Sequence, residues 1–448
     1  MVGRHLMTKR RRATSLVGED TTANSLPWFA LPKPLPKGAA VAIIGAGIAG
    51  ISCFQALLRA GFKPVIFERG ESLGAGGSGN AVGLIQPRLT TSDSLDGQFN
   101  ATAYLHAVQY YSHQENILEE VIWHGSRGGI QLARNAGEDK RFQKLVDEAR
   151  LPASEMEYMN PTALSEMAGI DIHQSGLYFK NAGALRPVEI LKILSRDMDI
   201  HFKVDVEHIE RRKSAWYLLD RAGNSLGEFD AVILTNAHEA TKLGDIRDVP
   251  LTAKRGQVSF LPASEASQNQ NCGLSFGRYV TPPFDLGAGQ KFHVVGASYC
   301  ELGVGEIEAA QNLNAADHVK NLEGLSSISK SYDDVVISTS TKGRASIRAT
   351  TIDHWPVLGG VQDGDICDQH YFDLRHGKPA HNYPEITYQT GLYCMTGLGS
   401  RGLQMAPLLS TALAGLLAGS PNVLEKRFLD AIHPARFQIR KLKRKVGR

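Results

Sequence analysis

The sequence predicts an α/β chain of two domains, one built on a parallel sheet and the other, of α+β character, on an antiparallel sheet. Its 448 residues exceed what a single hydrophobic core usually supports. The apolar run VAII at 41–44 is typical of a buried parallel strand. The run LTAKRGQVSFLP at 251–262 instead alternates in polarity, and SFGRYVTPP (275–283) and FHVVGASY (292–299) are its expected antiparallel partners.

The composition is that of a globular protein, with 42% hydrophobic and 21% charged residues. No apolar run approaches the roughly 20 residues that span a bilayer. Five scattered cysteines without a CxxC pair predict neither a disulfide framework nor a zinc site, which favours a reducing, cytoplasmic location. The 15 histidines include no convincing ligand pair, so no metal is expected.

A glycine-rich turn follows the first predicted strand and opens a helix. In GAGIAG, Gly45 makes the tight turn, Gly47 lets a pyrophosphate approach the backbone, and Gly50 lets helix and strand pack closely. The helical run ISCFQALLRAG comes next, and the strand KPVIFE ends at Glu68, an acid placed to accept from ribose hydroxyls. This complete unit predicts a Rossmann-like dinucleotide site. The acid disfavours a 2′-phosphate, which leaves NAD or FAD.

The rest of the chain favours FAD over NAD. A nicotinamide enzyme would be expected to continue in regular βαβ steps, whereas here the loop GAGGSGNAVGLIQPRL at 74–89 follows the second strand. Its small residues let the backbone lie along an extended dinucleotide, and Ser78 and Asn80 can supply hydrogen bonds. The run FDAVILTNA at 229–237 predicts a further strand that passes the cofactor.

A second glycine-rich turn lies near the end of the chain. GLYCMT predicts a strand, and the loop at 397–402 then leads into a long apolar helix. The backbone N–H groups and the positive helix end there suit the pyrimidine oxygens of a flavin. Arg401 in this loop is either part of that site or an exposed cap residue, and we favour the first interpretation.

Seven motifs occur in one order along the chain: GAGIAG, GGSGNAVGLIQPRL, GALRPVEIL, LTAKRGQVSFLP, VVGASY, SIRATTIDHWPVLGG and TGLGSRGLQMAPLL. In this order they resemble the FAD-dependent amine oxidoreductases of the D-amino-acid oxidase and glycine oxidase type. More narrowly, they resemble the C-terminal oxidase half of the bifunctional tRNA wobble-uridine modification enzymes, the MnmC family. The resemblance covers about residues 40–442.

The resemblance implies an enzyme that converts 5-carboxymethylaminomethyluridine of tRNA, with or without 2-thiolation, to 5-aminomethyluridine and glyoxylate. It implies non-covalent FAD, because residues 346–359 lack the cysteine that holds the flavin in relatives of the sarcosine oxidase type. The cofactor-binding positions expected from the motifs and the resemblance are Gly45, Gly47, Ile48, Ala49, Gly50, Glu68, Arg69, Ser78, Gly79, Asn80, Gln86, Val206, Asn236, Gly397, Gly399, Ser400, Arg401, Gly402 and Leu403.

Arg348 in SIRATTIDHWPVLGG matches the arginine with which the amino-acid oxidases of this family bind a substrate carboxylate. A planar guanidinium suits that anion, and a structural ion pair is the alternative. Tyr279 is a second catalytic candidate over the substrate face of the flavin, although core or edge packing is an equal alternative. Asp353 and His354 are expected to brace their loop through hydrogen bonds rather than to take protons.

Basic residues crowd both ends of the chain, although the formal net charge is only +3. We expect a docked C-terminal helix beside the flavin mouth, with Phe437, Ile439 and Leu442 facing inward. Its cations would bind the phosphates of the tRNA anticodon arm, and a solvated tail is the alternative. The cations in question are Arg440, Lys441, Arg444 and Lys445.

The predicted boundaries place a disordered basic tail and linker at 1–38 and a basic C-terminal segment at 421–448. The FAD-binding domain is expected at 39–90, 180–248 and 341–420, and the substrate domain at 91–179 and 249–340. No methyltransferase half is expected, so a separate methyltransferase would act on the product. Two other functions stay open: an oxidase of a free small amine or amino acid, such as glycine, sarcosine or a D-amino acid, and a flavin-binding scaffold without turnover.

Overall fold

The computed structural model describes residues 26–246, 248–287, 289–303, 306–334 and 341–444. A six-stranded sheet has the strand order β21-β22-β13-β1-β2-β9, and its pairings are parallel except that β21 runs antiparallel to β22. Apolar β-branched residues fill its central strands, as burial on both faces requires. The strands are β1 (Ala40–Ile44), β2 (Lys63–Glu68), β9 (Ile200–Phe202), β13 (Ala231–Leu234), β21 (Val357–Gln362) and β22 (Tyr388–Thr396).

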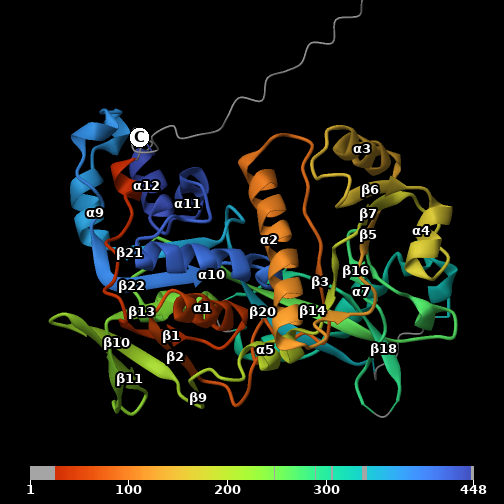
Figure 1. Ribbon diagram of the computed structural model, residues 1–448, viewed down its shortest axis with the longest axis horizontal. Helices are drawn as coiled ribbons and strands as arrows, with labels where there is room; N and C mark the ends of the chain where they lie inside the picture. Colours follow the sequence, from red (N-terminus) through yellow and green to blue (C-terminus); the bar gives the residue numbers. More distant parts are fainter. Residues whose placement is uncertain (1–25, 247, 288, 304–305, 335–340, 445–448) are drawn as a thin grey trace, which may run out of the picture.

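Two helices lie side by side on this sheet (Figure 1). α1 (Ile48–Arg59) follows β1, and α10 (Gly402–Ala418) follows β22, so both helices begin where a strand ends. α2 (Leu95–Leu118) packs against α10 and adds to the same core. A Cβ atom on Gly50 would lie 1.9 Å from the Gly45 carbonyl oxygen, so this packing of α1 on β1 requires a glycine, as its motif predicts.

A ten-stranded, mostly antiparallel sheet forms the second layer, with the path β19-β14-β18-β16-β15-β5-β7-β6 and with β17 and β20 paired to β18 and β14. β14 has the predicted bounds. The strands are β5 (Gly129–Leu132), β6 (Met156–Met159), β7 (Gly176–Phe179), β14 (Leu251–Pro262), β15 (Gly273–Ser275), β16 (Tyr279–Val280), β17 (Phe284–Asp285), β18 (Lys291–Gly296), β19 (Cys300–Glu301) and β20 (Gly343–Thr351).

Two expectations about this sheet were wrong. The run SFGRYVTPP pairs with β18 rather than with β14. The long second neighbour of β14 is β20, which pairs with residues 251–259 of β14 and carries Arg348. Residues 343–351 therefore belong to the antiparallel sheet, although the predicted boundaries put them in the FAD-binding domain. Because β14 and β20 are far apart in the sequence, no local sequence pattern predicts that they pair.

Two small sheets complete the strands, and most remaining helices lie at the periphery. One small sheet joins β10 (Val206–Arg212), β11 (Ala215–Asp220) and β12 (Ser225–Phe229); the other joins β3 (Gly83–Ile85), β8 (Gly183–Leu185) and β4 (Trp123–His124). The helices are α3 (Ala136–Asp147), α4 (Pro161–Ala168), α5 (Pro187–Leu194), α6 (Ala240–Leu243), α7 (Ala315–Leu322), α8 (Leu325–Ile328), α9 (Gly364–Tyr371), α11 (Lys426–Ile432) and α12 (Arg436–Lys443).

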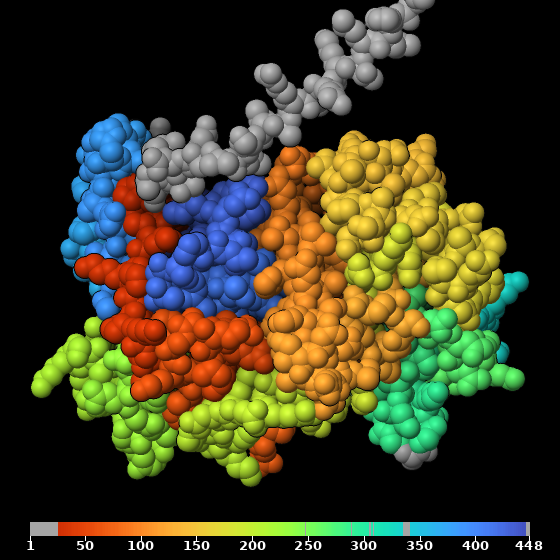
Figure 2. Space-filling model, viewed as in Figure 1, coloured from red at the N-terminus to blue at the C-terminus, as the bar shows by residue number. Residues whose placement is uncertain are grey.

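Residues 26–38, predicted as a disordered linker, are instead part of the packed fold. Trp28 is 4% exposed and meets the rings of Tyr371 and Tyr383 edge-on. The Leu35 N–H donates to the Leu417 carbonyl at 2.8 Å. Figure 2 shows the red N-terminal residues against the blue C-terminal ones. A buried tryptophan outweighs the local proline signal, and residues 1–25 lie outside the described residues.

Within the described ranges, no helix combines the length and the apolar character needed to cross a membrane.

Candidate active site

A cavity of about 970 Å³ brings the predicted site residues together. Its walls come from both sheets: β1, β2 and the helix starts of α1 and α10 on one side, and β16, β18 and β20 on the other. Every predicted cofactor-binding and catalytic residue lines it except Gly50 and Gly79. Gly50 packs α1 on β1, and a Cβ on Gly79 would lie 2.1 Å from the Gly74 carbonyl oxygen.

The first helix N-terminus opens into one end of this cavity. Gly45 has φ +105°, which favours glycine, and the Ser78 hydroxyl accepts a hydrogen bond from the Ile48 N–H at 3.0 Å. Glu68 accepts from the Ala46 N–H at 2.8 Å and from the Gly70 N–H at 2.7 Å. A carboxylate has about four acceptor positions, so Glu68 can also accept from ribose hydroxyls. The positive end of the helix suits a pyrophosphate.

An ion-pair cluster borders the same end of the cavity. Arg69 lies 2.6 Å and Lys242 lies 3.3 Å from the Glu239 carboxylate. Burial alone would raise the pKa of Glu239, but the hydrogen bond and charge of Arg69 hold that pKa below its ordinary value. Val206 and Asn236 also line this end, and the Asn236 side-chain oxygen is buried without a hydrogen-bond partner.

The glycine-rich loop at 74–80 is tied down by Arg344, a residue that sequence reasoning missed. Its guanidinium donates to the carbonyl oxygens of Gly74, Ala75 and Gly76 at 3.3, 3.2 and 2.6 Å and to the Asn80 side chain at 3.4 Å. A signal for it existed, because residues 344, 346 and 348 alternate onto one face of a strand. The loop is therefore fixed to β20 of the other sheet.

The second glycine-rich loop lies where α10 begins. The Gly399 N–H donates to the Ala349 carbonyl at 2.8 Å, which joins the loop to β20. Arg401 is not an exposed cap residue: it lines the cavity and donates to the Asn100 side chain at 2.5 Å. Burial lowers the pKa of Arg401. A Cβ on Gly402 would lie 3.0 Å from Ile48, so the N-terminal ends of α10 and α1 lie next to each other.

Gln86 lines the cavity but directs its amide into the second sheet. It donates to the carbonyl oxygens of Ile130 and Gly273 at 3.3 and 3.5 Å. Gln86 therefore connects the end of the glycine-rich loop to β5 and β15, and only part of its surface faces the cavity.

Arg348 is a buried cation at the other end of the cavity. It is 6% exposed, and one of its guanidinium nitrogens is buried without a hydrogen-bond partner. No carboxylate of the described residues forms an ion pair with it. The alternative of a structural ion pair is therefore not seen, and an anion in the cavity would satisfy this buried charge.

Two tyrosines flank Arg348. The Tyr299 ring centroid lies 5.0 Å from the guanidinium carbon. Tyr279 lines the cavity, and burial raises its pKa to about 12 although the charge of Arg348 opposes that shift. Its hydroxyl is therefore a protonated donor at neutral pH. Tyr279 was a predicted candidate, whereas Tyr299 lies inside the motif VVGASY and was not singled out.

Gly256 of β14 makes room for Arg348. A Cβ at this position would lie 1.3 Å from a guanidinium nitrogen, so any other residue would displace the cation. This explains why a glycine stands in the motif RGQVS, at a position to which no function could be assigned from the sequence. Its neighbours Arg255 and Gln257 point to the opposite face of the strand.

The cavity fits an extended dinucleotide. Two helix N-termini, the Glu68 carboxylate and the unpaired buried atoms of Asn236 and Arg348 are spread along its length. FAD would be held by the residues around α1 at one end and by the 397–402 loop near the other. The described lining residues include no cysteine.

The C-terminal helix docks as expected but not where expected. In α12, Phe437 and Ile439 are buried, yet no residue of α12 lines the cavity, so its predicted place beside the flavin mouth was wrong. Lys441 lies 2.9 Å from Asp248, and Arg440 pairs with Asp353. Lys445 lies outside the described residues. The helix α12 follows α11 in the chain and contacts both α11 and α9.

Asp353 braces its loop, as predicted. It accepts from the buried Arg436 at 3.0 and 3.1 Å and also pairs with Arg440. Burial alone would raise the pKa of Asp353, but these two arginines lower it to about 2.

The fold and the site define a flavoprotein of the dinucleotide-binding type. The model of the FAD dependent oxidoreductase family matches residues 40–416, so the chain belongs to this family of FAD-dependent enzymes.

Two relatives of the chain carry a more specific name. The tRNA 5-methylaminomethyl-2-thiouridine biosynthesis bifunctional protein MnmC of Magnetococcus marinus is 35% identical over 94% of this chain and 62% of its own length. The protein of the same name from Burkholderia lata is 29% identical over the whole chain and 68% of its own length. The chain thus spans less than two thirds of the Magnetococcus relative.

Solved structures share the fold. Glycine oxidase from Geobacillus kaustophilus has a TM-score of 0.67 at 16% identity, covering 89% of this chain and 99% of its own. Iminodiacetate oxidase from Chelativorans sp. has a TM-score of 0.64 at 18% identity, covering 86% and 97%. The predicted D-amino-acid oxidase and glycine oxidase type of fold is confirmed.

Proposed function

We propose that this chain oxidises the carboxymethylaminomethyl group of a tRNA wobble uridine, forming 5-aminomethyluridine, with or without 2-thiolation, and glyoxylate. The observation that carries the proposal is Arg348, a buried guanidinium that faces the cavity without a carboxylate partner in the described chain. A buried charge is costly unless it is paired, so the site is suited to a substrate that ends in a carboxylate. The names of the relatives supply the tRNA context.

The residues at the substrate end bind and orient. Arg348 holds the carboxylate through two parallel N–H···O bonds, which fixes the adjacent CH₂ group. Tyr279 remains a hydrogen-bond donor beside it, because burial raises its pKa to about 12. When bound, FAD supplies the two-electron oxidation of the CH–NH unit to C=N. Water then adds to the C=N carbon, and the C–N bond breaks to leave the primary amine on the uridine and glyoxylate.

We further propose that the FAD is held non-covalently, since the described cavity wall contains no cysteine. Acid precipitation of the purified yellow protein is expected to release FAD into the supernatant. Flavin that stays in the pellet would contradict this attachment, and a colourless protein that cannot be reconstituted would contradict the cofactor itself.

The proposed partner is the anticodon arm of tRNA in the cytoplasm. The modified base must leave its stack so that its carboxylate can reach Arg348. Exposed Arg444 remains a candidate phosphate contact, whereas Arg440 and Lys441 already pair with acids. A methyltransferase activity, on a separate protein or elsewhere, would consume the amine product. Nucleoside mass spectrometry of tRNA from a deletion strain tests the proposal: carboxymethylaminomethyluridine is expected to accumulate, and an unchanged profile would reject it.

The second candidate is an oxidase of a free small amine, since Arg348 could equally bind the carboxylate of glycine or sarcosine. The two are separated by mixing FAD-loaded protein with sarcosine or with tRNA from the deletion strain. Fast flavin reduction by tRNA and slow reduction by sarcosine supports the first candidate, and the reverse supports the second. Reduction of the flavin by either sarcosine or tRNA would exclude the remaining function, a flavin-binding scaffold without turnover.

A further inference from the structure

Tyr299 is an aromatic ring that lies partly in the cavity and partly in solvent. It lines the cavity and is 49% exposed, whereas the neighbouring Arg348 is 6% exposed. Its ring centroid lies 5.0 Å from the guanidinium carbon of Arg348. The ring therefore marks the place where the buried cation meets the open end of the cavity.

The chain on both sides of Tyr299 is fixed to β14. The Ser298 N–H donates to the Gln257 carbonyl at 3.1 Å, and the Ser298 hydroxyl accepts from the Gln257 N–H at 3.3 Å. On the other side, Cys300 pairs with Arg255 in the β14–β19 ladder. Because β14 neighbours both Tyr299 and Arg348, this strand fixes the backbone that carries the Tyr299 ring relative to Arg348.

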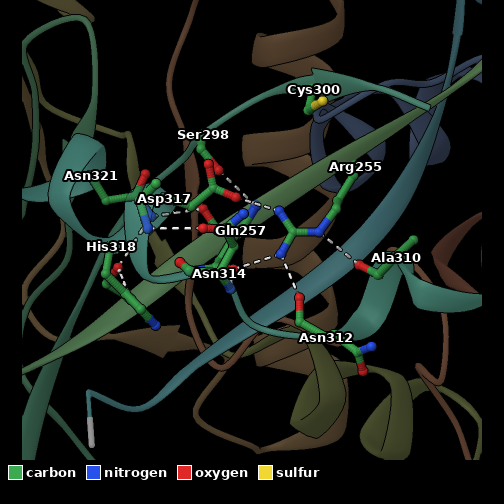
Figure 3. Close-up of polar contacts among 12 residues, drawn as sticks. Arg255, Gln257, Ser298, Cys300, Ala310, Asn312, Asn314, Asp317, His318 and Asn321 are labelled. Carbon is green, nitrogen blue, oxygen red and sulfur yellow. Dashed lines mark hydrogen bonds and ion pairs between the residues drawn. The ribbon is translucent and has the colours of Figure 1, made fainter. Parts of the chain in front are cut away.

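A buried polar network stiffens the same wall (Figure 3). Arg255 forms an ion pair with Asp317 inside the fold, and the Gln257 side chain accepts from the Asn314 N–H at 2.7 Å and donates to its carbonyl at 2.8 Å. The stretch 310–317 is therefore bound to the two β14 residues that also hold 298–301. Other acceptors of the Arg255 guanidinium are Ala310 O, Asn312 O and Gln257 Oε1, at 3.0, 2.5 and 2.6 Å.

The proposed substrate class is long enough to reach the Tyr299 ring from a carboxylate bound at Arg348. In a carboxymethylaminomethyl pyrimidine, a carbon, a nitrogen and a carbon separate the carboxylate carbon from the ring. Four bonds of ~1.5 Å span about 5 Å when extended. A carboxylate bound to Arg348 therefore brings the ring of such a substrate within reach of the Tyr299 ring, whereas glycine or sarcosine ends short of it.

We propose that Tyr299 is a specificity-determining residue, on which the planar ring linked to the glycine unit of the substrate stacks. The inference rests on the proposed function and names the group that sets its substrate class. An aromatic ring is a sequence-tolerant platform for a base, and removing one such platform weakens binding on the order of 10- to 100-fold. Because the backbone around Tyr299 is held in place, its half-exposed ring can stack on the ring of a substrate without first losing much conformational freedom.

The test uses two ether probes that lack the oxidisable amine: benzyloxyacetate, which has the same ring-to-carboxylate spacing, and methoxyacetate, which has no ring. Both are titrated calorimetrically into FAD-loaded protein. We expect the natural chain to prefer benzyloxyacetate by about tenfold or more. Tyr299→Ala is expected to lose most of this preference while its Kd for methoxyacetate stays within about twofold, and Tyr299→Phe is expected to keep the preference.

Two results would overturn the inference: a preference that survives in Tyr299→Ala, or equal weakening of both probes, which would mean that Tyr299 only supports Arg348. Because Tyr299 is half-exposed, the Ala variant should fold, and retention of FAD and of the melting temperature checks this. The probes are not oxidised, so their binding is independent of the tRNA experiment. If the tRNA experiment fails while the protein still prefers benzyloxyacetate over methoxyacetate, only the proposed function is rejected.

Discussion

The two ends of the cavity are built by different kinds of atoms. At the nucleotide end, glycines and the start of α1 shape most of the site within the stretch from Gly45 to Glu68, and Val206 and Asn236 complete it. At the substrate end, side chains from β16, from β20 and from the segment between β18 and β19 meet, although these elements are distant in sequence. A backbone-built site tolerates few changes of conformation, whereas a side-chain-built site can change its specificity through single substitutions.

The largest effect is expected from Gly256→Ala, which acts on the substrate end alone. Its Cβ would lie 1.3 Å from an Arg348 nitrogen, so the guanidinium must move. A displacement of about 1 Å costs on the order of 100-fold in rate. Stopped-flow reduction of the bound FAD by substrate measures this loss, while the FAD Kd should stay unchanged.

The matched control for this prediction is the same substitution in an Arg348→Ala background. There the added methyl group meets no guanidinium, so Gly256→Ala should cause no further loss of rate. A further loss would show that Gly256 serves the strand itself rather than Arg348.

The elements of the nucleotide end were predicted from sequence, because they follow one another along the chain. β2 has the bounds of the run KPVIFE, β1 begins one residue before the run VAII, and α1 begins three residues before the predicted helical run and ends two residues before Gly61. The substrate end was predicted only in part: Arg348 and Tyr279 came from a resemblance and from a guess. Neither Arg344 nor Gly256 has a local signal for its partner, since Arg344 binds carbonyl oxygens of the distant 74–76 loop and Gly256 makes room for Arg348 across the pairing of β14 with β20.

The same limit explains the misplaced segments. Trp28 lies in a proline-rich run that predicts a linker, and its aromatic partners lie near the other end of the chain. The position of α12 depends on α9 and α11, so its helical pattern predicted docking without the surface that receives it.

A smaller effect is expected from Arg348→Lys, which keeps the charge at the substrate end but removes the planar fork. Loss of bidentate pairing costs about 1.5–3 kcal/mol, or roughly ten- to a hundredfold in reduction rate. The variant should fold and retain FAD. Near-normal flavin reduction in single-turnover mixing would exclude Arg348 as the carboxylate site.

Ser78→Ala is expected to act on the nucleotide end with a still smaller effect. Its hydroxyl accepts from the Ile48 N–H and so joins the glycine-rich loop to the start of α1. Losing a cap of this kind costs about 1 kcal/mol, so the FAD Kd should rise roughly fivefold in fluorescence titration of the apoprotein. The reduction rate at saturating FAD should not change. The exposed Ser72, two residues before this loop, supplies the control, Ser72→Ala, which should leave the Kd unaltered.

The smallest effect at neutral pH is expected from a substitution of Asp353, which lies outside both ends of the cavity. Its pKa is about 2 in the folded chain, because Arg436 and Arg440 outweigh the cost of burial. The unfolded value is about 3.9, so the ionised form is favoured by folding. The resulting stability is fully present above pH 4 and is lost as the pH falls from about 4 towards 2.

Asp353→Asn should therefore lower the melting temperature at pH 7 and flatten its fall in acid, because the variant lacks the carboxyl group that gains a proton there. Thermal melts between pH 7 and pH 2.5 measure both effects. FAD affinity and the reduction rate at pH 7 should remain those of the natural chain, since Asp353 does not line the cavity. If the acid-side slopes of the two proteins coincide, other carboxylates dominate acid unfolding, and the ion pairs of Asp353 with α12 contribute little.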